Sequence, residues 1–275
     1  GNKVVIPGGF HLDKDSGTSV EEGIVIEDAR ENQFVWIPTG TYKTSSGAKT
    51  NNLSRRQWAA VNVVAEPTEV EGDSEIKVAY DESYYGESSA IVEFLQSAES
   101  VENGGNGGFY IGRYEQGTGN VNKAGVSTYS SVTIGTAKTQ AEAMYSGNTY
   151  VTSQLISSYA WDTALNFICQ NSSYGYILAT TTSKEYGNID TYEKELTGAY
   201  EKDNYSNIHD LLGNCYEWTT ENCSYYAGSQ AYRYTHRGAG FSNGGDANPG
   251  GRGFGNSTTS DSLGRSGFRP QLYIK

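Results

Sequence analysis

The chain has 275 residues, of which 36% are hydrophobic, and this suits one large domain or two small ones. A formal charge of −12 without a local basic patch argues against a nucleic-acid partner, and no run of about eighteen apolar residues could cross a membrane. The 34 Gly and 22 Tyr, set among short β-like runs, favour an irregular β-rich fold over a helical bundle.

Three short strands are predicted near the N-terminus, where β-branched or aromatic runs are bounded by Gly, Asp or Asn. They cover residues 3–7, 23–27 and 34–38. Residues 44–106 are acidic and weakly patterned, and we interpret them as an insertion or extended hairpin. Ile91–Leu95 is the one strong apolar cluster within it.

One strand and two helices are predicted next. Residues 109–115 alternate like a half-buried strand. Thr139 begins a capping-box pattern, and Trp161 to Ile168 carry apolar residues at helical spacing, with Ser158 near the start. We expect both helices to cover a sheet and to carry no chemistry.

Cys169, Cys215 and Cys223 are an odd number of cysteines without metal-ligand spacing. They allow one disulfide at most, and buried free thiols are the favoured interpretation.

The most unusual stretch lies between His236–Gly238 and Ser266–Pro270 and consists almost entirely of Gly, Ser, Asn, Asp and Thr. It is followed by a short apolar strand, so Phe268 and Leu272 are expected to be buried. A long irregular segment held between ordered elements is usually functional. We interpret it as a surface displayed on a rigid scaffold.

Five motifs in a fixed order resemble the formylglycine-generating-enzyme-like branch of the C-type lectin fold. They are Phe34–Pro38, Phe109–Glu115, Asn207–Trp218, Arg237–Gly238 and Gly267–Pro270. They match a "WIPGG" opening, a "YEV" strand, an "N-L-x-GNVWEW" turn, an "RGGSW" strand and a closing "GFR". The resemblance covers essentially the whole chain except residues 44–106. It implies one α+β domain over residues 1–275, with an irregular β-rich core and two helices.

The resemblance also raises the possibility of catalysis. In the copper-dependent enzymes the cysteines follow the "RGGS" element, but residues 238–266 contain no Cys. The related iron-dependent sulfoxide synthases use a histidine cluster, whereas His11, His209 and His236 are scattered. A divergent metal-dependent oxidoreductase that uses Cys215 or Cys223 is therefore the alternative function. A third hypothesis, carbohydrate binding of the C-type lectin kind, has even less support, because the usual sugar-binding motif is absent.

A calcium site is another feature that the resemblance implies. The family's turn supplies one side chain, two backbone carbonyls and a Glu, which match Asp210, Gly213, Cys215 and Glu217. Such oxygen ligands suit Ca²⁺. The favoured alternative has Glu217 bonded to backbone amides or paired with Arg269 in the core.

The C-terminus most resembles the variable proteins of diversity-generating retroelements, which display a hypervariable patch between these two anchors. Their mutagenesis targets adenines in AAC-like codons, from which Lys, Glu, Gln, Met and Trp cannot arise. Residues 238–266 contain none of the five. The resemblance implies a non-catalytic protein with a variable region over residues 237–270. It would bind a macromolecular ligand, either protein or surface glycan, on a phage virion or bacterial surface, and relatives include oligomers.

In such a surface, Gly, Ser and Asn provide adaptable hydrogen bonds, while aromatic residues and Arg provide contact area. The predicted contact residues are Phe241, Ser242, Asn243, Asp246, Asn248, Arg252, Phe254, Asn256, Ser257 and Asp261. Phe241 and Phe254 could instead pack in the core. Arg269 is expected to be structural, with its guanidinium tying loop carbonyls together.

Overall fold

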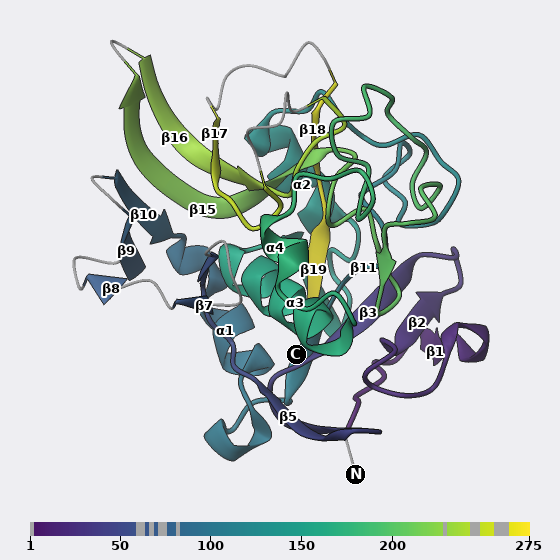
Figure 1. Ribbon diagram of the computed structural model, residues 1–275. Helices are drawn as coiled ribbons and strands as arrows, with labels where there is room; N and C mark the ends of the chain where they lie inside the picture. The colour runs from purple at the N-terminus through teal and green to yellow at the C-terminus, as the bar shows by residue number, and fades with distance from the viewer. Residues whose placement is uncertain are drawn as a thin grey trace.

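The computed structural model describes residues 3–58, 64–65, 69–70, 76–80, 83–227, 230–242, 248–255 and 264–275. Within these ranges the chain forms two main β-sheets and four short helices (Figure 1). The predicted α+β class is therefore confirmed.

The first sheet has six strands in the order β1-β2-β3-β11-β19-β12, and every neighbouring pair is antiparallel. Its strands are β1 (Phe10–Leu12), β2 (Val25–Asp28), β3 (Gln33–Pro38), β11 (Gly108–Gly112), β12 (Val151–Leu155) and β19 (Pro270–Ile274). The last strand of the chain, β19, thus lies inside the sheet. Phe268 and Leu272 are fully buried, as predicted, so the C-terminal segment contributes side chains to the core.

The second sheet is built around the long curved hairpin β15–β16, which Figure 1 shows in green. Its strands are β8 (Glu69–Val70), β9 (Ile76–Tyr80), β10 (Ser83–Glu87), β15 (Tyr216–Ala227), β16 (Gln230–Arg237), β17 (Gly253–Gly255) and β18 (Ser266–Phe268). Strand β18 pairs with β15 in parallel, whereas the other pairs are antiparallel.

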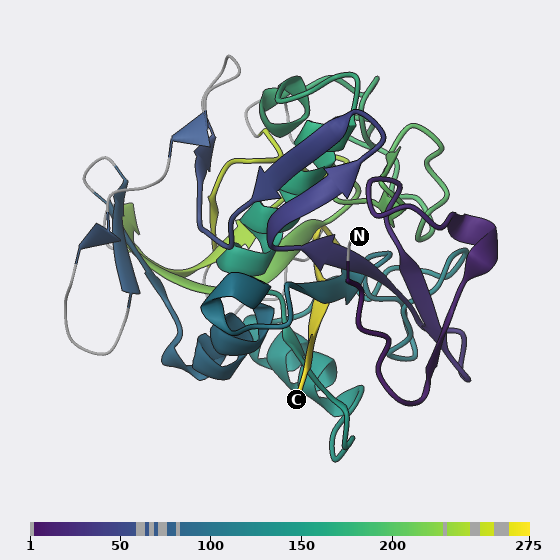
Figure 2. The ribbon, with the colours of Figure 1, turned by 90° about the horizontal axis from the view of Figure 1, so that it is seen from below.

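Three two-stranded ladders complete the β structure. They are β4 (Gly40–Thr44) with β5 (Gly47–Asn51), β6 (Gln57–Trp58) with β7 (Val64–Ala65), and β13 (Asn204–Tyr205) with β14 (Ile208–His209). Figure 2 shows the β4–β5 hairpin lying across α3. The β4–β5 hairpin begins before residue 44, whereas a second hairpin, β9–β10, lies within residues 44–106.

The helices are α1 (Val92–Ala98), α2 (Ile134–Ala143), α3 (Ser158–Asn171) and α4 (Ile177–Thr180). Helix α3 is central, since it contacts β3, β5 and β15 (Figures 1 and 2). Residues 158–169 are all buried, and the Ser157 side chain caps the helix by accepting a hydrogen bond from the Ala160 amide. Its predicted start at Ser158 is confirmed.

Two local predictions were wrong. Residues 3–7 form no strand, and the first strand is β1. Helix α2 begins five residues before Thr139, because Thr133 is its cap and the Thr139 hydroxyl donates to the Gly135 carbonyl inside the helix. The apolar cluster Ile91–Leu95 lies at the start of α1, and its Phe94 packs in the main core.

Candidate functional site

Buried arginines fix both ends of the predicted variable region. Arg237, the last residue of β16, pairs with Asp162 of α3, and its guanidinium lies 4.4 Å from the centre of the Trp161 ring. Arg269 donates from Nε to Glu217 at 2.8 Å and from its two NH groups to the carbonyls of Gly112 and His209. These bonds confirm the predicted structural role of Arg269.

The middle of the region, Pro249–Gly255, is attached to the scaffold. The Gly250 amide donates to the Ala179 carbonyl at 2.8 Å, and the Gly250 carbonyl accepts from Arg237 at 3.0 Å. Strand β17 then extends the second sheet by pairing with β16. The region is therefore not one continuous loop, because a docked segment separates residues 241–248 from residues 256–264.

Arg252 lies in this docked segment, which corrects its predicted place on the display surface. Its side chain is only 4% exposed, and its guanidinium donates to Glu221 at 2.8 Å and to Asp162 at 3.2 Å. A third bond reaches the Arg56 carbonyl at 2.9 Å. Burying a guanidinium is costly unless it is paired, and here two carboxylates are present. Arg252 is thus part of the scaffold.

The other predicted contact residues fall into two groups. Phe241, Ser242 and Asn248 are half-buried. Phe241 and Ser242 come shortly after Arg237, and Asn248 directly precedes the docked segment. The backbone of Phe254 pairs with Thr235 in β17, while its side chain lies outside the described part of the chain. The remaining residues also lie outside it, and they are Asn243, Asp246, Asn256, Ser257 and Asp261.

A loop that the sequence analysis did not single out runs beside the start of the variable region. The Tyr192 amide donates to the Phe241 carbonyl at 2.7 Å, and the Asp190 amide donates to the Gly240 carbonyl at 3.3 Å. The Tyr192 residue is 66% exposed. The contact with Phe241 has no local sequence signal, because its two partners are far apart in the chain.

Buried charges join α3 to the second sheet. Asp162 pairs with Arg237 and Arg252, while Glu221 pairs with Arg252 and, at 3.0 Å, with Arg55. Burial alone would raise the pKa of Glu221, but the guanidiniums of Arg252 and Arg55 lower it to about 2. Glu221 is therefore ionised at neutral pH, and the network connects the insertion, α3 and the docked segment.

Glu87 ends β10 next to this network. Its carboxylate accepts hydrogen bonds from the amides of Ser88 and Ser158, both at 3.0 Å, and from the Thr220 hydroxyl. Burial, together with the nearby Glu221 carboxylate, raises the pKa of Glu87 to about 7. Its ionisation therefore changes near neutral pH.

Glu217, one of the predicted calcium ligands, is engaged by two other side chains. Both carboxylate oxygens of Glu217 are engaged, Oε1 by Arg269 and Oε2 by the Trp161 indole N–H at 3.1 Å. This is the alternative role predicted for Glu217. Among the described residues, no group of three or more His, Cys, Asp or Glu side chains is arranged to hold a metal ion.

Two further carboxyl groups, those of Asp203 and Asp210, are buried near Glu217. Asp210 accepts from the Gly198 amide at 2.6 Å through Oδ2, while its Oδ1 and both oxygens of Asp203 have no hydrogen-bond partner. Burial raises the pKa of Asp210 to about 7 and that of Asp203 well above its usual range. A proton on one or both of these acids offsets the cost of burying them close together.

All three cysteines are free and buried, which confirms the favoured interpretation. Burial, with a further contribution from the Glu115 carboxylate, raises the pKa of the Cys215 thiol well above its ordinary value. Burial also raises the pKa of Cys169 to about 12. Nucleophilic and metal-binding cysteines require a thiolate, so the surroundings of these two thiols disfavour such roles.

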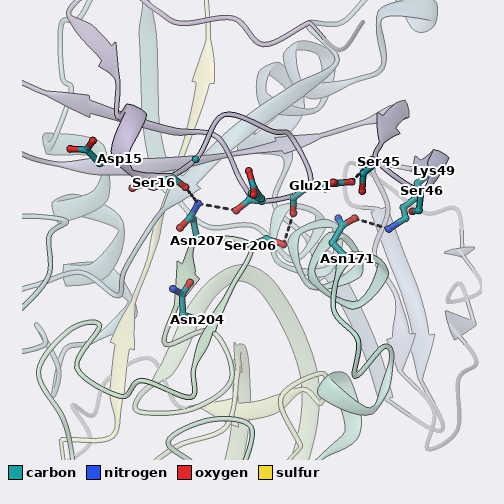
Figure 3. Close-up of a pocket in the computed structure, with 12 residues that line it drawn as sticks. Asp15, Ser16, Glu21, Ser45, Ser46, Lys49, Asn171, Asn204, Ser206 and Asn207 are labelled. Atoms are coloured by element: carbon teal, nitrogen blue, oxygen red, sulfur yellow. Dashed lines mark hydrogen bonds between the residues drawn. The ribbon is translucent and has the colours of Figure 1, made fainter.

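A separate polar pocket of about 710 Å³ lies between the N-terminal segment, the β4–β5 turn and the β13–β14 hairpin (Figure 3). Asn207 donates to the carbonyls of Glu22 and Gly23 across it, at 2.8 and 2.9 Å. Lys49 donates to the Asn171 side chain at 2.8 Å. These polar groups bond to one another, so we interpret them as holding neighbouring segments of the chain together and not as a ligand site.

No helix in the described ranges is long and apolar enough to cross a membrane, in agreement with the prediction of no membrane span. Comparison with known proteins found no matching family model, no similar curated protein and no similar solved structure.

Proposed function

We propose that the chain is a non-catalytic ligand-binding protein, with a C-type lectin fold of the formylglycine-generating-enzyme type. Its variable surface lies near the C-terminus, and the ligand is a macromolecule. One observation carries the proposal. A segment rich in Gly, Ser and Asn, without Lys, Glu, Gln, Met or Trp over residues 238–266, is held between fully buried Arg237 and Arg269.

The docking of Pro249–Gly255 refines this proposal. A display surface must accept many side chains without loss of the fold, so its variable positions should be separate from residues that support the core. Arg252 ion-pairs with buried carboxylates, whereas Phe241 and Ser242 are half-buried. We therefore propose residues 241–248 and 256–263 as the variable stretches, with 249–255 as part of the scaffold.

The alternative oxidoreductase receives less support. Its proposed nucleophiles were Cys215 and Cys223, and both are buried. The Cys215 thiol has its pKa raised, which is the opposite of activation. Replacing all three cysteines with Ser would separate the two functions, since a binding protein should keep its ligand affinity.

Two libraries displayed on yeast test the proposal. The first randomises residues 241–248 and 256–263, and the matched control randomises residues 249–255. We expect the first library to remain displayed and folded and to yield binders to a purified globular protein such as lysozyme. The control library should mostly fail to fold. If the first library loses the fold, or if it folds but yields no binders, the proposed function is wrong.

The coding DNA provides an independent test. Copies of the gene sampled from a natural population should differ at adenines within the two stretches. Codons for residues 249–255 and for Arg237 and Arg269 should stay unchanged. Variation spread evenly over the gene would contradict the proposal.

A further inference from the structure

The loop Asn188–Glu195, hereafter the rim loop, lies directly beside the first residues of the variable region. The Phe241 amide donates to the Asn214 carbonyl at 2.9 Å, and the Phe241 carbonyl accepts from the Tyr192 amide at 2.7 Å. Phe241 is thus held between the turn at Asn214 and the rim loop. Any partner that contacts Phe241 is also close to the rim loop.

Two buried amide side chains hold the rim loop in place, one from the loop itself (Asn188) and one from the neighbouring turn (Asn214). Asn188 donates to the Asn214 side chain and to the Glu193 carbonyl, both at 3.0 Å. The Glu195 amide donates to the same Asn214 oxygen at 3.0 Å. Both Asn residues are fully buried, so the loop is supported along its whole length by the scaffold.

Tyr192 projects from this support in an unusual conformation. Its φ is 63°, in the left-handed region, and so is that of Asp190 at 53°. Such backbone is strained for a non-glycine residue and persists where the surroundings impose it. Interaction with the Asp190 carboxylate raises the pKa of the Tyr192 hydroxyl, and the Tyr192 backbone is held by its bond to the Phe241 carbonyl.

The rim loop also reaches the far end of the variable region. Lys194 donates to the Ser130 hydroxyl at 2.8 Å. A Cβ on Gly264 would lie 3.4 Å from the Lys194 amine, so Gly264 packs against the same loop. Leu196, just beyond, is 45% exposed. One loop therefore borders both ends of the variable region.

We propose that the rim loop is the constant half of the binding face, with Tyr192 as its aromatic anchor for a folded protein partner. This inference rests on the proposed function. An exposed Tyr on a backbone that is already held in place gives a large contact area and loses little conformational entropy on binding. Tyr is also among the residues that dominate binding energy at protein interfaces. The exposed apolar Leu196 and cationic Lys194 lie close to Tyr192 in sequence and enlarge the surface that a protein partner can contact.

The experiment uses the lysozyme binders from the library described above. Each clone receives Tyr192→Ala, and its affinity for lysozyme is measured. Because alanine keeps the backbone strain, Tyr192→Asn serves as a second variant, since Asn tolerates the left-handed region and lacks the ring. The matched control is Tyr150→Ala, which removes a 56% exposed Tyr next to the C-terminal Lys275.

We expect both Tyr192 variants to weaken lysozyme binding at least about tenfold in most clones, as for a central interface residue. Tyr150→Ala should change it less than about twofold. Clones that bind lysozyme equally well without the Tyr192 ring would overturn the inference and leave the proposed function intact. A library without any binders would instead refute the proposed function, and the inference with it.

Discussion

Arg269 and Glu217 form a fully buried ion pair in which Nε of the guanidinium donates to one carboxylate oxygen at 2.8 Å and Nη2 lies 2.7 Å from the same oxygen. Their side chains are 0% and 1% exposed. Burial alone raises the pKa of Glu217, and Arg269 opposes this effect. The pair therefore joins the end of the variable region to β15 at the centre of the molecule.

Removing one partner of this pair should be costly. Arg269→Met leaves a buried carboxylate without its counter-charge, and we expect the free energy of unfolding to fall by about 3–5 kcal/mol. The control is Arg30→Met, which breaks the Arg30–Asp28 pair, whose arginine side chain is 60% exposed. That variant should lose less than about 1 kcal/mol. If both variants lost the same unfolding free energy in urea, the buried pair would contribute no more to stability than the exposed one.

Calcium should have little effect on stability. The Glu217 carboxylate is already engaged by Arg269 and Trp161, so it is not free to bind a cation. An ion that binds only the folded chain raises the melting temperature, and here we expect less than about 1 °C between calcium and EDTA buffers. A clear rise in calcium that Asp210→Asn abolishes would show that the ion binds after all.

The sequence predicted those elements whose signals are local. The spacing in α3, the alternation in β11 and the apolar ending around Leu272 all led to elements that the structure contains. The order of five motifs also drew attention to Arg237 and Arg269, which are both fully buried. In α3, β11 and the C-terminal strand, the residues that give the signal are close together in the chain.

The misplaced features depend on distant partners. Arg252 looked like a displayed residue because its neighbours are small and polar, but its carboxylate partners are 31 and 90 residues away. The rim loop had no signal at all, since its support comes from Asn214. Composition reports what a segment could do in isolation, whereas burial is decided by what packs against it.

Arg252 itself gives a test of the refined variable region. Arg252→Met removes the bonds to Glu221 and Asp162 and should cost about 3 kcal/mol of unfolding free energy, as for a buried pair that loses one partner. Ser242→Ala, in the same region but half-buried, should stay within about 0.5 kcal/mol of the parent. If Arg252→Met left the free energy of unfolding unchanged, Arg252 would be a display residue and not part of the scaffold.

The cysteines should be unreactive in the folded chain. Each of the three thiols is buried, and burial raises the pKa of Cys169 and Cys215, so little thiolate is accessible to a reagent. We expect slow reaction with a disulfide reagent in native buffer and three fast-reacting thiols per chain in denaturant. Rapid native labelling of Cys215 would revive the oxidoreductase alternative.

Glu87 should make stability depend on pH in a distinctive direction. Its pKa in the folded chain is about 7, above the ordinary value of 4.5, because the site is buried and close to Glu221. A carboxyl with a raised pKa favours the folded state below its unfolded pKa, and this contribution is lost as pH rises from about 4.5 through 7. At about 1.4 kcal/mol per pKa unit, the loss could reach about 3 kcal/mol.

Glu87→Gln isolates this contribution, because Gln does not titrate. The amide alters the hydrogen bonds to Ser158 and Thr220, so the variant can be less stable at every pH. The informative quantity is therefore the parent-minus-variant difference in unfolding free energy, measured from pH 5 to 8. We expect this difference to fall with pH, since other buried acids such as Asp210 are common to both chains and largely cancel. A difference that stays constant or rises would show that Glu87 is ionised throughout, with the Arg55 guanidinium outweighing the effect of burial.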